Sequence, residues 1–234
     1  MKAPEFTDHD VERRTALIRG DGPRVTPIEL DAATPALETI LDRMHQVNTA
    51  LDSRGKASIA KLVAEGGSPP TDAEGAAEVR TLPEIVRTML RHADLFTCQT
   101  DLGIQLLSRG ALPPRERELA VLRIGWLCQA PYEFGEHVMV AKKVGVTSEE
   151  IEWIIQGSAA PGWSEHDRAV IRATEELYAD AMISDATWAV LARRYCDKQL
   201  IELPILIGQY QTVAYYQNAL RLRLHEGNDG LKAR

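Results

Sequence analysis

The stretch from Leu112 to Ile155 constrains the fold most strongly, because its sequence predicts three consecutive helices. The first, over residues 113–128, opens on two prolines, which are tolerated where an N–H has no helical partner. The second, over residues 131–145, opens on a proline and closes on a glycine. The third begins at Thr147, which has capping-box spacing with Glu150.

The middle helix carries two ionisable residues, Glu133 and His137, one turn apart on its apolar side. Their row continues with two valines, at positions 140 and 144. A charge facing the core is costly unless it is paired or works in a cavity. A carboxylate next to an imidazole orients the ring and raises its pKa, which suits proton transfer near neutral pH. A structural hydrogen bond or ion pair between helices is the alternative.

The central stretch resembles the carboxymuconolactone decarboxylase family, within the superfamily that includes alkylhydroperoxidase D. The matching segments are RERELAVLR, GWLC, YEFGEHV and AKKVGVTSEEIE, and the similarity continues through WSEHDRAVIRATEEL and DKQLIEL to about His225. The resemblance implies an all-α helical bundle. It also implies a homo-oligomer, a trimer or a hexamer formed by two trimers, with pockets near the subunit contacts.

The family pattern distinguishes two chemistries. The peroxidase branch carries a Glu, a CxxC pair and a His that is separated from the second Cys by three residues. Glu118 and His137 stand at the right separation here, but Ala130 and Glu133 occupy the thiol positions and Cys128 has no partner in the motif. The chain therefore resembles the decarboxylase branch, whose pattern also has a Glu and a His in this helix.

Composition sets wider bounds. The 234 residues, 44% of them hydrophobic, can build one substantial core. A net charge of −7 argues against nucleic acid or an anionic membrane as the main partner. We expect a cytoplasmic protein, because no apolar run is long enough to span a bilayer and the N-terminus lacks an apolar signal segment. The cysteines and histidines show no metal-ligand spacing, so neither a metal nor a cofactor is expected.

The predicted organisation has three parts. Residues 1–80 form an N-terminal extension, with a helix at 35–52 and a Gly/Pro-rich linker at 65–79. Residues 81–226 form the carboxymuconolactone decarboxylase-like domain. The polar tail, residues 227–234, is predicted to be disordered.

Helical periodicity and caps predict the remaining elements of an all-α fold. Pro204 lies inside the last predicted helix, which should therefore kink or restart there. One weak strand candidate lies at residues 24–28. The further helices are expected at residues 11–18, 57–64, 81–92, 93–107, 164–181, 185–195 and 198–224.

The resemblance implies roles for residues of the central stretch. His137 is the acid/base, Glu133 orients or tunes it, and Glu118 is the second acid/base candidate. Tyr132 is a candidate donor to a developing oxyanion. Cys128, a substrate-binding candidate, is interpreted first as a core thiol.

Three arginines near the same residues, Arg115, Arg117 and Arg123, are candidates for a carboxylate clamp. An arginine in a helix rich in glutamate is more often paired on the surface, so that interpretation stays open for each.

The functional hypothesis is a cofactor-free carboxy-lyase of aromatic catabolism, acting on a small unsaturated lactone or an oxygenated carboxylic acid by general acid/base proton transfer. Three alternatives stay open. The first is another acid/base reaction on a related small molecule, such as hydration, isomerisation or ring opening. The second is a non-catalytic oligomeric ligand-binding protein, and the third is a thiol peroxidase.

Overall fold

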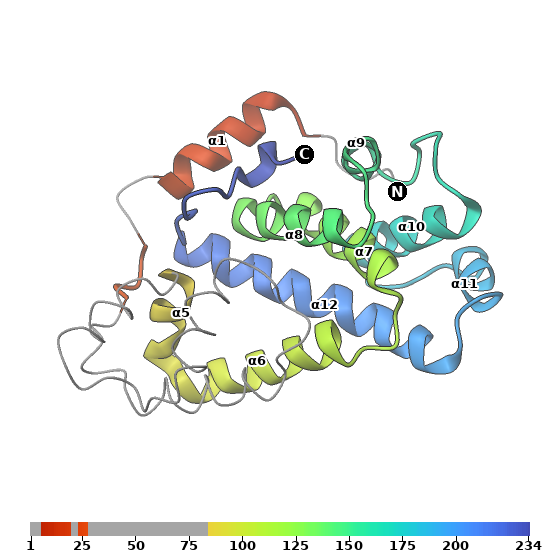
Figure 1. Ribbon diagram of the computed structural model, residues 1–234, viewed down its shortest axis with the longest axis horizontal. Coiled ribbons are helices and arrows are strands. Elements are labelled where there is room, and N and C mark those ends of the chain that lie inside the picture. Colours follow the sequence, from red (N-terminus) through yellow and green to blue (C-terminus); the bar gives the residue numbers. More distant parts are fainter. Residues whose placement is uncertain (1–5, 20–22, 28–83) are drawn as a thin grey trace. The chain divides into compact units, whose positions relative to one another are not determined.

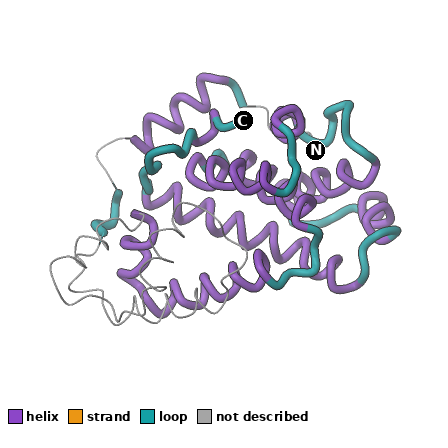
Figure 2. Tube along the Cα trace, in the orientation of Figure 1, coloured by secondary structure: helices purple, strands orange, loops and turns teal. Residues whose placement is uncertain are grey.

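The computed structural model describes residues 6–19, 23–27 and 84–234, and these residues contain helices and no strand (Figures 1 and 2). The chain divides into two compact units, residues 1–22 with 111–234 and residues 23–110. The predicted helices at 35–52 and 57–64 and the linker at 65–79 lie outside the described residues. The strand candidate is not borne out, because residues 24–27 form a bend and extended loop.

The larger unit is built around α7 (Pro114–Leu127), which packs against α8 (Pro131–Lys143), α10 (Glu165–Asp180) and α12 (Asp197–Leu220). Every residue of α7 from 116 to 127 is buried, including charged ones. A helix covered on several sides cannot keep a polar face in water, so its charged residues must find partners in the protein.

The helix boundaries of the central stretch follow its sequence signals. Both α7 and α8 begin on a proline, and Gly145 adopts a φ of +91° after α8. Helix α9 (Ser148–Gln156) starts with the predicted capping box between Thr147 and Glu150. Ser164 caps α10, with its side chain accepting from the backbone N–H of Asp167.

Two predicted helices have different ends in the structure. Helix α11 (Asp185–Ala192) ends before Tyr195, the predicted last residue. Helix α12 continues through Pro204 to Leu220, so the restart predicted at that proline does not occur. Its cap is formed at Cys196, where the backbone N–H donates to the Gln199 side chain over 2.9 Å.

The prediction of a disordered tail at residues 227–234 is wrong. The tail contains the 3-10 helix η3 (Gly230–Lys232), which packs on α8, and Leu231 is buried. Asn228 donates to the carbonyl of Tyr132 over 3.0 Å and to Glu136 over 2.8 Å. A polar sequence is ordered here because its amides bind specific groups on α8.

The N-terminal helix α1 (Asp8–Arg19) also belongs to the larger unit and contacts η3. Its apolar residues Val11 and Ile18 are buried. Phe6, just before it, lies edge-on to Trp126 of α7, with 6.4 Å between ring centroids. The helix predicted at residues 11–18 is thus present within α1 and packs on the larger unit.

The described part of the smaller unit contains α5 (Glu84–Met89), η2 (Leu90–His92) and α6 (Ala93–Ser108). The predicted helix at 93–107 is therefore confirmed to within one residue. Arg91 donates to the carbonyl of Thr26 over 2.8 Å, which ties this helical segment to the chain before it.

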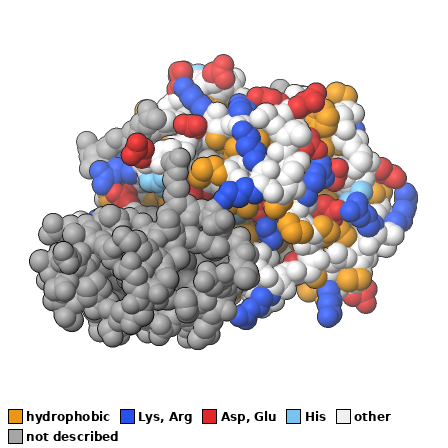
Figure 3. All heavy atoms as spheres, in the orientation of Figure 1, with side chains coloured by type: hydrophobic (Ala, Val, Ile, Leu, Met, Phe, Trp, Pro, Cys, Tyr) orange, Lys and Arg blue, Asp and Glu red, His pale blue; other side chains and the backbone are white. Residues whose placement is uncertain are grey.

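On the face shown in Figure 3, basic side chains (Lys and Arg) and acidic ones (Asp and Glu) are mixed. No helix among residues 6–19 and 84–234 is long and apolar enough to cross a bilayer.

Candidate functional site: a buried imidazole between two carboxylates

The candidate site is a chain of hydrogen bonds centred on His137. Its Nδ1 lies 2.6 Å from Glu118 Oε2, and its Nε2 lies 3.0 Å from Glu133 Oε1. Arg117 Nε donates to the other oxygen of Glu118 over 2.9 Å, and Gln217 Nε2 donates to Glu133 Oε2 over 2.7 Å. We call these five residues the imidazole cluster.

Three helices supply the imidazole cluster. Glu133 and His137 lie one turn apart on α8, which brings them together without any other element. The packing of α7 against α8 then places Glu118 at the second ring nitrogen. Gln217 comes from α12, far along the chain, and its amide N–H donates to the Glu133 oxygen that does not contact His137.

The surrounding charges decide the protonation state of His137. Burial lowers its pKa, but the charges of Glu118 and Glu133 and their hydrogen bonds outweigh this and raise the pKa to about 10. The ring is therefore an imidazolium at neutral pH, and each N–H donates to a carboxylate. Burial would likewise raise the pKa of Glu118, but His137 and Arg117 hold it below its ordinary value.

The cluster is charge-balanced and mostly closed to solvent. Two cations, Arg117 and His137, face two anions, Glu118 and Glu133. Glu118 has no exposed surface, whereas Glu133 is 5% exposed and His137 is 8% exposed. The small exposed surface of the cluster lies mainly on Arg117, His137 and Glu133.

Tyr210 of α12 borders the cluster. Its ring is nearly perpendicular to the His137 ring, with 4.9 Å between the centroids. Burial, together with the charges of Glu133 and Glu118, raises the pKa of Tyr210 well above its ordinary value. Tyr210 is therefore a neutral phenol that packs against the imidazolium.

Two of the three predicted clamp arginines lie elsewhere. Arg115 bonds to Glu150 and Asp167 and so ties α7 to α9 and α10. Arg123 is buried and donates to the carbonyls of Ile154 and Ile155 and to Glu175. Both arginines hold helices together.

Arg117 does join the imidazole cluster, but as the partner of Glu118. This contact engages Arg117 with a carboxylate of the protein, on the side of Glu118 opposite His137.

Tyr132 and Cys128 are also outside the cluster in their observed contacts. The Tyr132 ring packs against His225 of the tail, with 5.9 Å between centroids. Burial raises the pKa of the Cys128 thiol to about 12. This sulfur is therefore protonated at neutral pH and is a poor nucleophile.

A second buried carboxylate, Glu116, has partners of its own. It accepts a hydrogen bond from the Tyr195 hydroxyl over 2.6 Å, lies 3.3 Å from His166 Nε2 and pairs with Arg194. These contacts join the start of α7 to α10 and to the segment after α11. No group of three or more potential ligands is arranged for a metal ion within the described ranges.

Gln217 and Tyr210 were not among the residues predicted for the site. Both lie in α12, in a part of the helix where amides and tyrosines alternate with apolar residues. The one sequence signal for Gln217 was the presence of an amide in a helix predicted to be buried, because a buried glutamine requires a hydrogen-bond partner.

The described residues form an all-helical fold that holds a buried imidazole between two carboxylates. Residues 93–176 match the model of the Carboxymuconolactone decarboxylase family. The resemblance inferred from the central stretch is thereby confirmed for this segment. Among curated proteins, none matches the chain.

Solved structures support the same fold. The debrominase Bmp8, with a cysteine replaced by alanine and in complex with 2,3,4-tribromopyrrole, has a TM-score of 0.62 at 16% identity, covering 89% of this chain and 95% of that one. An uncharacterized peroxidase-related protein from Silicibacter sp. TM1040 has a TM-score of 0.61 at 12% identity, covering 91% and 98%. An alkylhydroperoxidase AhpD core protein from Ralstonia eutropha JMP134 has a TM-score of 0.56 at 15% identity, covering 65% and 82%.

Proposed function

We propose that this protein is a cofactor-free acid/base enzyme of the carboxymuconolactone decarboxylase type, acting on a small unsaturated lactone or an oxygenated carboxylic acid. The observation that carries the proposal is His137, an imidazolium held between Glu118 and Glu133. A buried, protonated group with a small exposed surface is suited to deliver a proton in a water-poor site.

A decarboxylation of this type can be written with the residues present. The bond between the substrate carbon and its carboxylate breaks, and its electron pair enters the conjugated carbonyl as a dienolate. Carbon dioxide leaves, and His137 transfers its proton to the carbon. A proton taken up from the solvent then restores the imidazolium, so that the substrate carboxylate and one proton give product and carbon dioxide.

The two carboxylates have different parts in this proposal. Glu118 is fully buried and bonds to Arg117, so it holds the ring in place and maintains its charge. Glu133, which is 5% exposed, keeps the Nε2 proton directed until a substrate replaces it. When His137 gives up that proton, it loses its charge and with it the two ion pairs to the glutamates. The attraction between the imidazolium and the developing negative charge of the dienolate offsets this cost.

Other acid/base reactions, including hydration, isomerisation and ring opening, would use the same proton donor. A non-catalytic ligand-binding protein is the alternative from a different class. A thiol peroxidase is less well supported, because Cys128 lacks a partner in the motif and has a raised pKa of about 12.

Turnover of 4-carboxymuconolactone and of a panel of unsaturated lactones and keto acids tests the proposal. The wild type should release carbon dioxide or consume a panel member, and His137→Gln should not. His225→Gln is the matched control, because it removes another histidine bonded to a glutamate, Glu136, outside the imidazole cluster. Equal activity in wild type and His137→Gln would refute the proposed donor.

The pH dependence gives a second readout of the same proposal. The active form carries the proton on His137, so turnover should stay level through neutral pH. It should fall as the pH approaches about 10, where His137 loses that proton. A profile that rises across this interval would assign the working group as a base.

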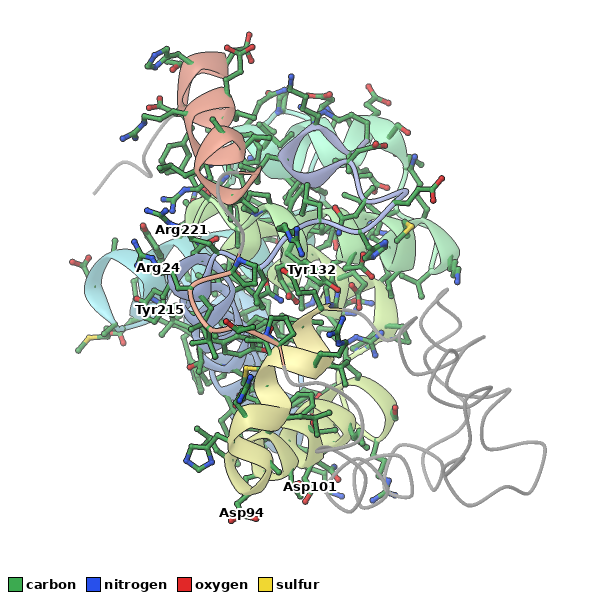
Figure 4. The ribbon with its side chains drawn as sticks, turned by 90° about the vertical axis from the view of Figure 1, so that its left-hand side faces the viewer. Arg24, Asp94, Asp101, Tyr132, Tyr215 and Arg221 are labelled. Carbon is green, nitrogen blue, oxygen red and sulfur yellow. The ribbon has the colours of Figure 1, made fainter. Side chains whose placement is uncertain are left out.

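We further propose that the protein assembles as a homo-oligomer, a trimer or a hexamer. Ile201, Ile205 and Tyr215 form an exposed apolar stripe along α12, and Tyr215 is labelled in Figure 4. Apolar side chains spaced along one helix face are suited to a subunit contact. Light scattering measures the assembly, and a monomer at micromolar concentration would contradict it.

A further inference from the structure

Gln217 has an orientation that its partner dictates. Its Nε2 donates to Glu133 Oε2 over 2.7 Å, and a carboxylate can only accept. The amide therefore cannot be flipped, and its oxygen, Oε1, points away from the carboxylate. Gln217 is 2% exposed, and among the described residues no group donates to this oxygen.

A buried carbonyl oxygen without a donor is costly and calls for an explanation. Two other amides, Gln129 and Asn218, also have an unpaired buried oxygen. Their N–H groups bond to main-chain carbonyls, of Trp126 for Gln129 and of Cys128 for Asn218, so these contacts do not join either amide to the imidazole cluster. Of the three, Gln217 is the one bonded to a carboxylate that also bonds to His137.

We propose that Gln217 Oε1 accepts a hydrogen bond from the substrate and thereby selects a hydroxyl-bearing lactone or acid. One amide then serves two purposes. Its N–H fixes Glu133, and its oxygen binds a donor on the ligand beside the proton of His137. This inference rests on the proposed function for the class of ligand. The preference for a hydroxyl group, however, is a property of binding and does not depend on turnover.

The charges of the cluster favour a hydroxyl as this donor. Arg117 and His137 balance Glu118 and Glu133, so the site offers no excess positive charge to a further carboxylate. A carboxylate of the ligand could not bind the Gln217 oxygen, because both groups are hydrogen-bond acceptors. A neutral hydroxyl supplies the missing proton without adding charge.

Calorimetric titration with three related lactones tests this selection. The ligands are γ-hydroxybutenolide, which has the donor, unsubstituted butenolide, which lacks it without added bulk, and γ-methoxybutenolide, its methyl ether. Wild-type protein should bind the hydroxyl compound about tenfold more tightly, or better, than either analogue. Equal affinities, or no binding of the hydroxyl compound, would overturn the proposal without any variant.

Gln217→Met, whose folding is checked by circular dichroism, should bring the three affinities together. Gln211→Met is the matched control, since it makes the same change on α12 at a residue bonded to Tyr215, and it should keep the wild-type preference. A preference that survives in Gln217→Met would assign Gln217 a structural role. If the protein binds the hydroxyl lactone more tightly but turns over no lactone, the proposed reaction is refuted and the inference about binding is supported.

Discussion

Replacing His137 by glutamine should remove a specific part of the pH dependence of folding. The folded protein holds the proton of His137 up to about pH 10, whereas an unfolded histidine releases it near 6.5. Because the folded pKa is the higher one, the stabilisation is fully present below pH 6.5 and is lost as the pH rises through 10. The variant lacks this titration.

The magnitude follows from the two pKa values. They differ by about 3.5 pH units, and each unit corresponds to about 1.4 kcal/mol, so the full stabilisation is on the order of 5 kcal/mol. Between about pH 7 and pH 10 the wild type should therefore lose on the order of 3 kcal/mol more of its free energy of unfolding than the variant.

Urea unfolding of both proteins at several pH values between about 7 and 10 measures this difference. The free energy of unfolding of the variant is subtracted from that of the wild type at each pH. Lysine, tyrosine and cysteine titrate in the same interval, and their contributions cancel in this difference. A difference in free energy of unfolding that stays constant over the interval would refute the reasoning. It would mean that the folded protein does not retain the His137 proton.

Three further predictions concern other parts of the structure. Gly135→Ala would place a Cβ 1.8 Å from the Asn228 side-chain oxygen and should cost about 1–3 kcal/mol in urea unfolding; an unchanged midpoint would contradict the observed packing of the tail. Cys128 should resist iodoacetamide near neutral pH while the two exposed cysteines react, as mass spectrometry would show; equal rates would exclude a pKa near 12. Arg123→Met removes the buried partner of Glu175 and should destabilise the fold by about 3–5 kcal/mol in thermal or urea unfolding; a neutral change would contradict its structural role.

Local signals predicted the part of the site that depends on one helix. Glu133 and His137 are one turn apart, so a correct assignment of α8 was sufficient to place them together. The capping box at Thr147 is local in the same way. Glu118 required the family pattern, because its approach to His137 depends on how two helices pack.

The roles of the arginines could not be predicted because α7 is covered on several sides. Periodicity assumes a polar face in water, yet Arg123 is 1% exposed and pairs inside the protein. Gln217 was missed for a related reason. Its partner Glu133 is 84 residues away in the sequence, and composition does not encode that contact.

The protonation state of His137 is the central claim, and NMR of the imidazole nitrogens and their protons tests it most directly. Spectra of wild type and His137→Gln at about pH 8 identify the ring, since its signals are absent from the variant. We expect both ring nitrogens of His137 to carry a proton at this pH, as two carboxylate partners require. A single neutral tautomer at about pH 8 would contradict the account, because a ring in that state would accept a proton where the proposed mechanism needs a donor.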